Sequence, residues 1–267
     1  MTKCDKCHRV AIIYQRYSGM HLCREHFEED VHRKIREALR KTGLFGHGSR
    51  MAEGLDGGRN SATLAFVLKN LFARRKDIEL LAVIIDEGGK TSPTANQARH
   101  VAEQLGIPHI VKSLPLLPDS EQSYILYSTR RRELLFRAAE ENGAGILATG
   151  EALDDEALEI FISYLRGNLD AVMPPASPKG SESGEHKIAW IKPLRRIPEK
   201  EVRLYAIGHD LGFVDAGEKP YADALRFVAK RQLFGFDSRH PGTNYSLLRG
   251  LEKGQGQEGA GKGKAFK

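Results

Sequence analysis

Side chains that bind metal are concentrated at the N-terminus. The chain has three cysteines, in the segments CDKC and LCREH, and the candidate ligands are Cys4, Cys7, Cys23 and His26. A C-x2-C pair and a C-x2-H pair with fifteen residues between them have the spacing of a tetrahedral zinc site. Because three thiolates and one imidazole leave no position for water, we expect structural Zn²⁺.

Other histidines lie near this cluster in the sequence and could compete for the fourth position by spacing alone: His8, His21 and His32. We prefer His26 because it completes the second pair. The odd number of cysteines argues against a disulfide framework. The intervening RVAIIYQRYSGMHL predicts a β-hairpin that turns at Ser18 and Gly19.

The segment LDGGRNS has the character of a phosphate-binding turn. Two glycines before an apolar run allow backbone N–H groups at a helix N-terminus to approach phosphate oxygens. The candidate binding residues of this turn are Gly57, Gly58, Asn60 and Ser61. Asp56 places a negative charge beside the expected phosphates, so we expect nucleotide binding to be weakened.

A second segment, ATGEALDDEA, carries the candidate catalytic carboxylates. Gly150 permits close backbone approach at a strand end, and Asp154 and Asp155 could handle magnesium or a proton. The alternative is that both aspartates only stabilise the start of a helix. Further along the chain, Arg130 to Arg132 form a cationic stripe that suits phosphate, or else a solvated helix face.

Alternating strands and helices must position these residues. The strands are expected at residues 51–55, 78–86, 108–114, 145–150 and 187–194, and the helices at 25–44, 61–73, 94–105, 128–141, 155–165, 199–211, 222–234 and 245–251. This alternation predicts an α/β fold with a parallel sheet covered on both faces. Ligands bind beyond the carboxyl ends of such strands, where Asp86 would join the glycine turn and Gly150.

Composition and charge set the organisation of the chain. Hydrophobic residues make up 40% and charged residues 28%, and no apolar run is long enough to cross a membrane, so we expect a cytoplasmic protein. The net charge of +6 permits a polyanionic partner. The expected parts are a zinc module (1–30), a connecting helix and linker (31–48), a nucleotide-binding domain (49–215), C-terminal helices (216–254) and a disordered basic tail (255–267).

Three motifs follow the Cys/His module in order: LDGGRNS, ATGEALDDEALEIF and IKPLRRIPEKEV. Together they resemble the tRNA 2-thiolation enzymes of the TtuA/TtcA type and their wobble-uridine relatives. The resemblance implies a Rossmann-like fold of the adenine nucleotide alpha hydrolase type that binds ATP and Mg²⁺ and adenylates a tRNA base before sulfur transfer. It also implies that Arg131 and Lys192 contact the nucleotide. A dimer is compatible with the sequence.

The chain departs from this family at the positions that handle sulfur. The family's C-x2-C pair aligns with Tyr124 and Tyr127, and the cysteine of its C-P-Y segment aligns with Lys219. In the loop, Asp56 replaces a serine and Asn60 replaces an aspartate. We therefore expect no iron–sulfur cluster, because tyrosine and lysine cannot ligate one. Sulfur would come from a sulfur-carrier protein or a cysteine-bearing paralogue.

Two alternatives to a carrier-fed adenylating enzyme stay open. The first is a non-catalytic subunit that binds tRNA and a paralogue, which the altered loop favours. The second is an ATP pyrophosphatase that acts on another carbonyl substrate. Release of pyrophosphate in the presence of ATP and tRNA distinguishes the enzyme from the binding subunit.

Overall fold

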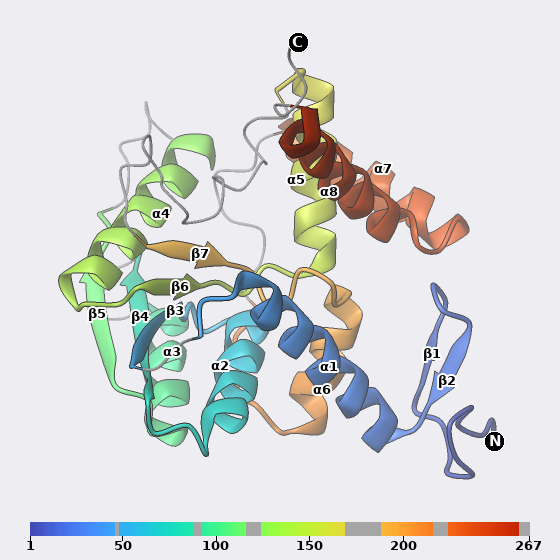
Figure 1. Cartoon of the computed structure of the whole chain (residues 1–267), viewed down its shortest axis with the longest axis horizontal. Helices are drawn as coiled ribbons and strands as arrows, with labels where there is room; N and C mark the ends of the chain where they lie inside the picture. Colours follow the sequence, from blue (N-terminus) through green and yellow to red (C-terminus); the bar gives the residue numbers. More distant parts are fainter. Residues whose placement is uncertain (46–47, 88–91, 116–123, 169–187, 216–223, 262–267) are drawn as a thin grey trace, which may run out of the picture. The chain divides into compact units, whose positions relative to one another are not determined.

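A computed structural model describes residues 1–45, 48–87, 92–115, 124–168, 188–215 and 224–261 (Figure 1). The chain forms two compact units. The first consists of Met1–Val31, Leu153–Pro175 and Ala224–Lys267, and the second of His32–Ala152 and Ala176–Asp223. Within the described residues, no helix is both long and apolar enough to span a membrane.

The second unit contains a five-stranded sheet. Its strands are β3 (Ser49–Gly54), β4 (Ile78–Asp86), β5 (His109–Ser113), β6 (Ile146–Ala148) and β7 (Ala189–Ile191). They lie in the order β5-β4-β3-β6-β7, and every pairing is parallel. From β3 the chain moves outward through β4 and β5 and then returns to the other side of β3 as β6 and β7. The order therefore reverses between β3 and β6, which is where sheets of this kind bind ligands.

Helices cover both faces of this sheet: α2 (Arg59–Phe72), α3 (Pro93–Gln104), α4 (Tyr124–Glu141) and α6 (Glu199–Gly208). Val83 of β4 packs in a cluster with Leu135 of α4, whereas Ala82 packs in another cluster with Ala62 of α2 and Ala98 of α3. Because adjacent strand residues point to opposite faces, the two clusters lie on opposite sides of the sheet. The predicted parallel sheet with two covered faces is confirmed.

The first unit contains the N-terminal hairpin and three packed helices. The hairpin pairs β1 (Ile13–Gln15) with β2 (Met20–Leu22), and Gly19 in its turn has a φ of +71°, which glycine adopts without strain. Helix α1 (Arg24–Thr42) follows the hairpin, and its residues from His32 onward belong to the second unit. The other helices are α5 (Leu153–Arg166), α7 (Ala224–Arg239) and α8 (Thr243–Gly261).

The structure and the expected boundaries differ at three places. Helix α4 begins at Tyr124, four residues before the expected start at residue 128. Helix α8 continues to Gly261, into the segment expected to be disordered from residue 255. Helix α5, expected within the domain 49–215, belongs to the first unit, where Leu158 and Leu233 of α7 share one apolar cluster and Leu153 and Leu248 of α8 share another. These contacts join segments distant in sequence, which local patterns do not reveal.

Candidate nucleotide site and metal centre

The glycine turn connects β3 to α2 at the point where the strand order reverses. Gly57 has a φ of +78°, and a Cβ atom on it would lie 2.1 Å from the carbonyl oxygen of Thr94, at the start of α3. Both the conformation and the contact therefore require glycine. Gly58, the N-cap residue of α2, leads directly into the helix. The turn is thus held with its backbone at the N-terminus of α2, where N–H groups favour an anion.

The loop that follows β6 approaches the same helix. A Cβ atom on Gly150 would lie 3.0 Å from the backbone nitrogen of Ser61 and 3.1 Å from the carbonyl carbon of Asn60. This spacing is tighter than side chains normally accept, so the backbone of the β6 loop lies directly against the first turn of α2. The structure therefore brings Gly150 together with the residues of the glycine turn, across the switch point of the sheet.

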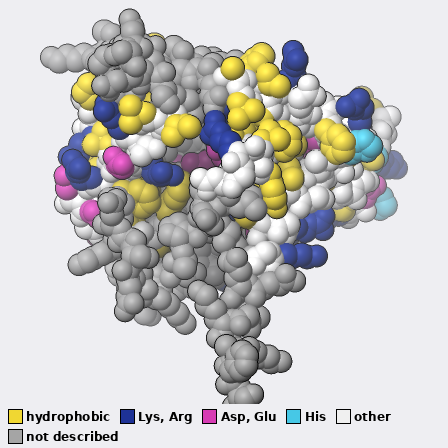
Figure 2. All heavy atoms as spheres, turned by 90° about the horizontal axis from the view of Figure 1, so that it is seen from above, with side chains coloured by type: hydrophobic (Ala, Val, Ile, Leu, Met, Phe, Trp, Pro, Cys, Tyr) yellow, Lys and Arg dark blue, Asp and Glu magenta, His cyan; other side chains and the backbone are white. Residues whose placement is uncertain are grey.

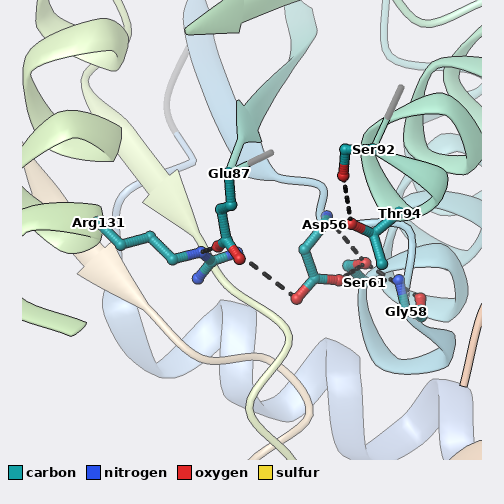
Figure 3. Close-up of polar contacts among 7 residues, drawn as sticks. All are labelled: Asp56, Gly58, Ser61, Glu87, Ser92, Thr94 and Arg131. Carbon is teal, nitrogen blue, oxygen red and sulfur yellow. Dashed lines mark hydrogen bonds and ion pairs between the residues drawn. The ribbon is translucent and has the colours of Figure 1, made fainter. Parts of the chain in front are cut away.

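The Asp56 carboxylate is bound to the turn itself (Figure 3). Its Oδ1 atom accepts a 2.6 Å hydrogen bond from the Ser61 hydroxyl and a 3.0 Å bond from the backbone N–H of Gly58. Both donors belong to the N-terminus of α2, which stabilises negative charge. A phosphate would therefore have to compete with Asp56 for these donors, in addition to being repelled by its charge.

Replacing Asp56 with serine is expected to tighten ATP binding about five- to thirtyfold, which corresponds to roughly one to two kcal/mol. The substitution removes the charge and releases the two donors. Isothermal titration calorimetry with ATP measures the change. Asp56→Asn serves as the matched variant, because it keeps an oxygen that accepts hydrogen bonds and loses only the charge, so it should recover part of the gain. Unchanged or weaker binding by Asp56→Ser would show that Asp56 does not oppose the nucleotide.

Arg131 of α4 lies between two carboxylates at this site (Figure 3). Its Nη2 atom is 3.5 Å from Asp56 Oδ2, and its Nε atom is 3.1 Å from Glu87 Oε1. Burial lowers the pKa of Arg131, but the charges of Asp56 and Glu87 outweigh it and raise the pKa. The guanidinium is thus a permanent cation beside the turn. Glu87 was not identified from the sequence, although it directly follows Asp86 at the carboxyl end of β4.

The arginines of the predicted cationic stripe on α4 contact different neighbours. The guanidinium of Arg132 lies 5.8 Å from the centre of the Trp190 ring, whereas Arg131 reaches the glycine turn. Consecutive helix residues point about 100° apart, so these two side chains serve different neighbours. Lys192 also contacts Trp190, with its Nζ atom 4.4 Å from the ring centre, and Trp190 Nε1 donates a 2.7 Å bond to the Thr149 hydroxyl. Sequence reasoning identified Lys192 but missed Trp190 and Thr149.

Asp86 ends β4 with its side chain buried. Its Oδ2 atom lies 3.6 Å from Nη2 of Arg99 in α3. Asp86 is therefore ion-paired with a side chain of α3, the helix that also packs against Gly57. Asp86 lies at the carboxyl edge of the sheet, as expected. The ion pair with Arg99 compensates the cost of burying its charge.

Glu53 is a buried acidic residue near the carboxyl end of β3, paired with Ala82 of β4 on one side and Ala148 of β6 on the other. Only 2% of the residue is exposed, and its Oε1 atom has no hydrogen-bond partner within the described part of the chain. Burial raises the pKa of Glu53 well above its usual value, and the charge of Asp56 adds to the rise. The sequence indicated a weakened strand at this position but not a titrating group.

Glu53→Gln is expected to stabilise the protein more at about pH 8 than at about pH 5. Because the pKa of Glu53 is raised on folding, its contribution to stability is full below the usual carboxyl pKa and falls as the pH rises toward the folded value. The amide has nearly the same shape and does not ionise. Urea unfolding at the two pH values measures the difference, and an equal effect at both would contradict a neutral Glu53.

Asp154 and Asp155 begin α5 in the first unit, together with Glu156. Asp154 Oδ1 accepts a 3.3 Å hydrogen bond from the side-chain amide of Asn244 in α8. Acidic residues in a first turn stabilise a helix, so this position is consistent with the structural alternative. The same pair of adjacent carboxylates is also a donor set that suits Mg²⁺.

The four predicted metal ligands form a compact cluster in the first unit. Their ligand atoms all lie within 4.8 Å of one another. Nδ1 of His26 is 3.4 Å from Cys4 Sγ and 3.3 Å from Cys23 Sγ, and the sulfurs of Cys7 and Cys23 are 3.7 Å apart. The edge of a tetrahedron of zinc–sulfur bonds is about 3.8 Å. These spacings therefore fit one tetrahedral metal ion, and His26 is the histidine in the cluster.

The surroundings shift the pKa values of Cys4 and Cys7 in opposite directions. Burial opposes ionisation of Cys4, but N–H groups of Cys23, Lys6 and Cys7 and the side chain of His26 lower its pKa to about 6. The backbone N–H of Arg9 lowers the pKa of Cys7, but burial and the nearby thiols Cys23 and Cys4 raise it overall. A divalent cation would relieve this crowding of negative charge, since metal ligation requires deprotonated thiols.

The fold and the sites define a nucleotide-binding domain of the PP-loop type joined to a Cys/His metal site. The PP-loop domain family matches residues 27–219, and the N-terminal LIM domain of 2-thiouridine synthetase TtuA matches residues 3–28. The chain belongs to the TtuA/NcsA tRNA 2-thiolation family of PP-loop ATPases. The resemblance inferred from the ordered motifs is confirmed.

Similar proteins cover nearly the whole chain. The tRNA 2-thiolation protein NcsA of Haloferax volcanii is 32% identical over 278 residues, 94% of this chain and 86% of that protein. The tRNA-5-methyluridine(54) 2-sulfurtransferase of Pyrococcus horikoshii is 30% identical over 260 residues, 94% and 82% of the two chains. The structure of U34-tRNA thiolase NcsA from Methanococcus maripaludis, with its [4Fe-4S] cluster, matches with a TM-score of 0.81 and 27% identity, covering 95% of this chain and 87% of that one.

Tyr124 and Tyr127, at which the sequence resemblance expects family cysteines to be replaced, lie at the start of α4. Tyr127 is 4% exposed and packs against Leu114 and Leu126, so it serves as an apolar core residue. Tyr124 is the first residue of the helix. Lys219, the third position expected to replace a family cysteine, lies outside the described residues. All three cysteines of the chain lie in the N-terminal metal cluster.

Proposed function

We propose that this protein binds ATP at the glycine turn and adenylates a tRNA base during 2-thiolation, while a second protein supplies the sulfur. One observation carries the proposal: all three cysteines belong to one closed four-ligand cluster, whereas the backbone of the nucleotide loop is retained. Thiolate is the form of cysteine that carries sulfur or binds a cluster, and thiols held by a structural metal are not free for either task. The sulfur donor would be a sulfur-carrier protein or a cysteine-bearing paralogue.

The proposed cofactors follow from the side chains present. Zn²⁺ fits the ligand set Cys4, Cys7, Cys23 and His26, and we propose that no iron–sulfur cluster is bound. ATP fits the close backbone approaches at Gly57 and Gly150, which leave N–H groups at the start of α2. Asp154 and Asp155 would hold Mg²⁺, which neutralises phosphate charge when it is bound.

Each proposed residue has a defined task. The backbone of Gly57, Gly58 and Ser61 would bind phosphate oxygens after Asp56 has released its two donors. Arg131, already paired with Asp56, would hold the displaced carboxylate or contact a phosphate. Lys192, Asn60 and Asp86 are proposed to position the nucleotide. The substrate would be tRNA, and the protein would act with it in the cytoplasm.

A second candidate function is a non-catalytic subunit that binds tRNA and a paralogue. The hydrogen bonds from Ser61 and Gly58 to Asp56 favour it, because they occupy the donors that a phosphate needs. The two functions differ in one product. Only the adenylating enzyme releases pyrophosphate when ATP, Mg²⁺ and tRNA are all present.

The purified protein is expected to release pyrophosphate with ATP, Mg²⁺ and tRNA, and to form no thiolated nucleoside when sulfide is added. Thiolation should appear only when a second protein supplies a thiocarboxylate or cysteine. Mass spectrometry of digested tRNA and a coupled pyrophosphate assay measure both products. Thiolated tRNA formed by this chain alone would reject the need for a second protein, and absence of pyrophosphate would favour the binding subunit.

A further inference from the structure

Helix α7 has one side that packs and one that does not. Ala229 and Leu233 are buried in a cluster with residues of α5, and Arg226 forms an ion pair with Glu159 of that helix. On the other side, Phe227 is 49% exposed and Phe234 is 74% exposed. Neighbouring exposed apolar side chains bordered by polar residues often mark a surface that contacts a partner.

Basic side chains lie between the two phenylalanines. Phe227 and Phe234 are seven residues apart, which places them on the same side of the helix about 10.5 Å from each other. Lys230 and Arg231 lie three or four residues from both, and both are exposed. Among the described residues, neither Lys230 nor Arg231 forms an ion pair with an acidic side chain, whereas Arg226 on the same helix pairs with Glu159. We call these four residues the α7 face. On the surface shown in Figure 2, exposed hydrophobic side chains likewise lie beside Lys and Arg side chains.

The combination of flat aromatic rings and uncompensated cations selects the kind of partner. A second copy related by a two-fold axis across the α7 face would place Lys230 and Arg231 against the same cations, which is unfavourable. A nucleotide strand with unpaired bases carries both negative charge and flat apolar rings, which complement the cations and the phenylalanines of the α7 face. Its bases stack on aromatic rings and its phosphates pair with Lys and Arg. Paired bases are already stacked in a duplex, so a duplex would use only the cations.

We propose that the α7 face binds unpaired nucleotides of RNA, with Phe227 and Phe234 stacked on bases and Lys230 and Arg231 on the phosphates between them. The proposal rests on the proposed function in taking tRNA as the natural source of this RNA. It goes further in assigning a surface of the first unit to a single-stranded part of the substrate.

The test compares binding of an unpaired oligouridine of about twelve nucleotides with binding of a duplex of equal length, by fluorescence anisotropy at low salt. The double variant Phe227→Leu/Phe234→Leu keeps apolar side chains and removes the aromatic rings. It is expected to bind the unpaired probe at least about tenfold more weakly, with a smaller loss for the duplex. Lys230→Gln/Arg231→Gln should lower the slope of log affinity against log salt by about one to two.

Phe236→Leu is the matched control. Phe236 is on the same helix and is 49% exposed, but it lies two residues from Phe234 and so points to the opposite side. This variant should bind both probes as the wild type does. Because all of the substituted side chains are exposed, circular dichroism should remain unchanged in every variant.

Equal loss of the unpaired and paired probes in the leucine variant, or no loss at all, would overturn the proposal. So would a fall in molecular mass by light scattering in the leucine variant, which would assign the face to a second copy of the chain. Pyrophosphate release separates this proposal from the proposed function. If the protein binds unpaired RNA through the α7 face but releases no pyrophosphate, the proposed adenylation is rejected and the RNA-binding proposal stands.

Discussion

Alanine at Asp154 or at Asp155 is expected to lower tRNA-dependent pyrophosphate release by at least about a hundredfold, since proton transfer and charge stabilisation by positioned groups contribute effects of that size. The two carboxylates are adjacent in the first turn of α5. The affinity for ATP without magnesium should change little. The coupled pyrophosphate assay with saturating ATP and tRNA measures the loss.

A purely structural role for the pair predicts a different result. Removing one acidic residue from a helix N-terminus costs about 0.3–1 kcal/mol, and the rate per folded molecule would not fall. Glu156→Gln is the control, because it removes the third acidic residue from the same turn. If Asp154→Ala and Asp155→Ala lose stability as this control does but keep their rate, the carboxylates only stabilise α5.

The same variants distinguish the two proposed functions when this chain is mixed with tRNA, ATP and the protein that supplies sulfur. If a paralogue with its own iron–sulfur cluster adenylates and thiolates the base, a mixture of the two proteins should still thiolate tRNA when this chain carries Asp154→Ala or Asp155→Ala. If this chain adenylates the base and a carrier brings sulfur, thiolation should be lost together with pyrophosphate release. Mass spectrometry of nucleosides from the reconstituted reaction measures the outcome.

Cys7→Ser is expected to abolish binding of the one zinc ion that we predict for each chain. Structural zinc sites contribute on the order of 10–16 kcal/mol of apparent binding free energy, and a serine hydroxyl does not replace a thiolate ligand. The hairpin β1–β2 should then lose its order, because few apolar contacts hold so small an element. Metal analysis by mass spectrometry and limited proteolysis of residues 1–31 measure both effects.

His8→Ala is the control for the zinc site. His8 is close to Cys7 in sequence but is outside the ligand cluster, so this variant should keep its zinc. Stoichiometric iron in the wild-type protein, or a full complement of zinc in Cys7→Ser, would show that the four-ligand zinc site is wrong.

Local sequence patterns were sufficient for the metal cluster and for the order of strands and helices. The spacing of Cys4, Cys7, Cys23 and His26 encodes a tetrahedral site because a hairpin brings two short pairs together with little freedom. Strands and helices follow from hydrophobic periodicity, which depends on neighbours in the sequence. Even so, four residues of α4 and the extension of α8 were missed, since both contain residues that favour other conformations locally.

Contacts between distant segments decided what the candidate nucleotide site looks like. The sequence shows that Asp56 is acidic, but only the folded loop shows its carboxylate bonded to Ser61 and Gly58. The sequence shows three consecutive arginines, but only the folded helix shows that Arg131 faces Asp56 of the glycine turn and Arg132 faces Trp190. Hydrogen bonds and burial depend on atoms brought together by packing of the sheet and helices. For that reason residue types and spacing determined the family and the metal ligands, and the tertiary structure alone determined which groups are paired, which are buried and in which direction burial shifts a pKa.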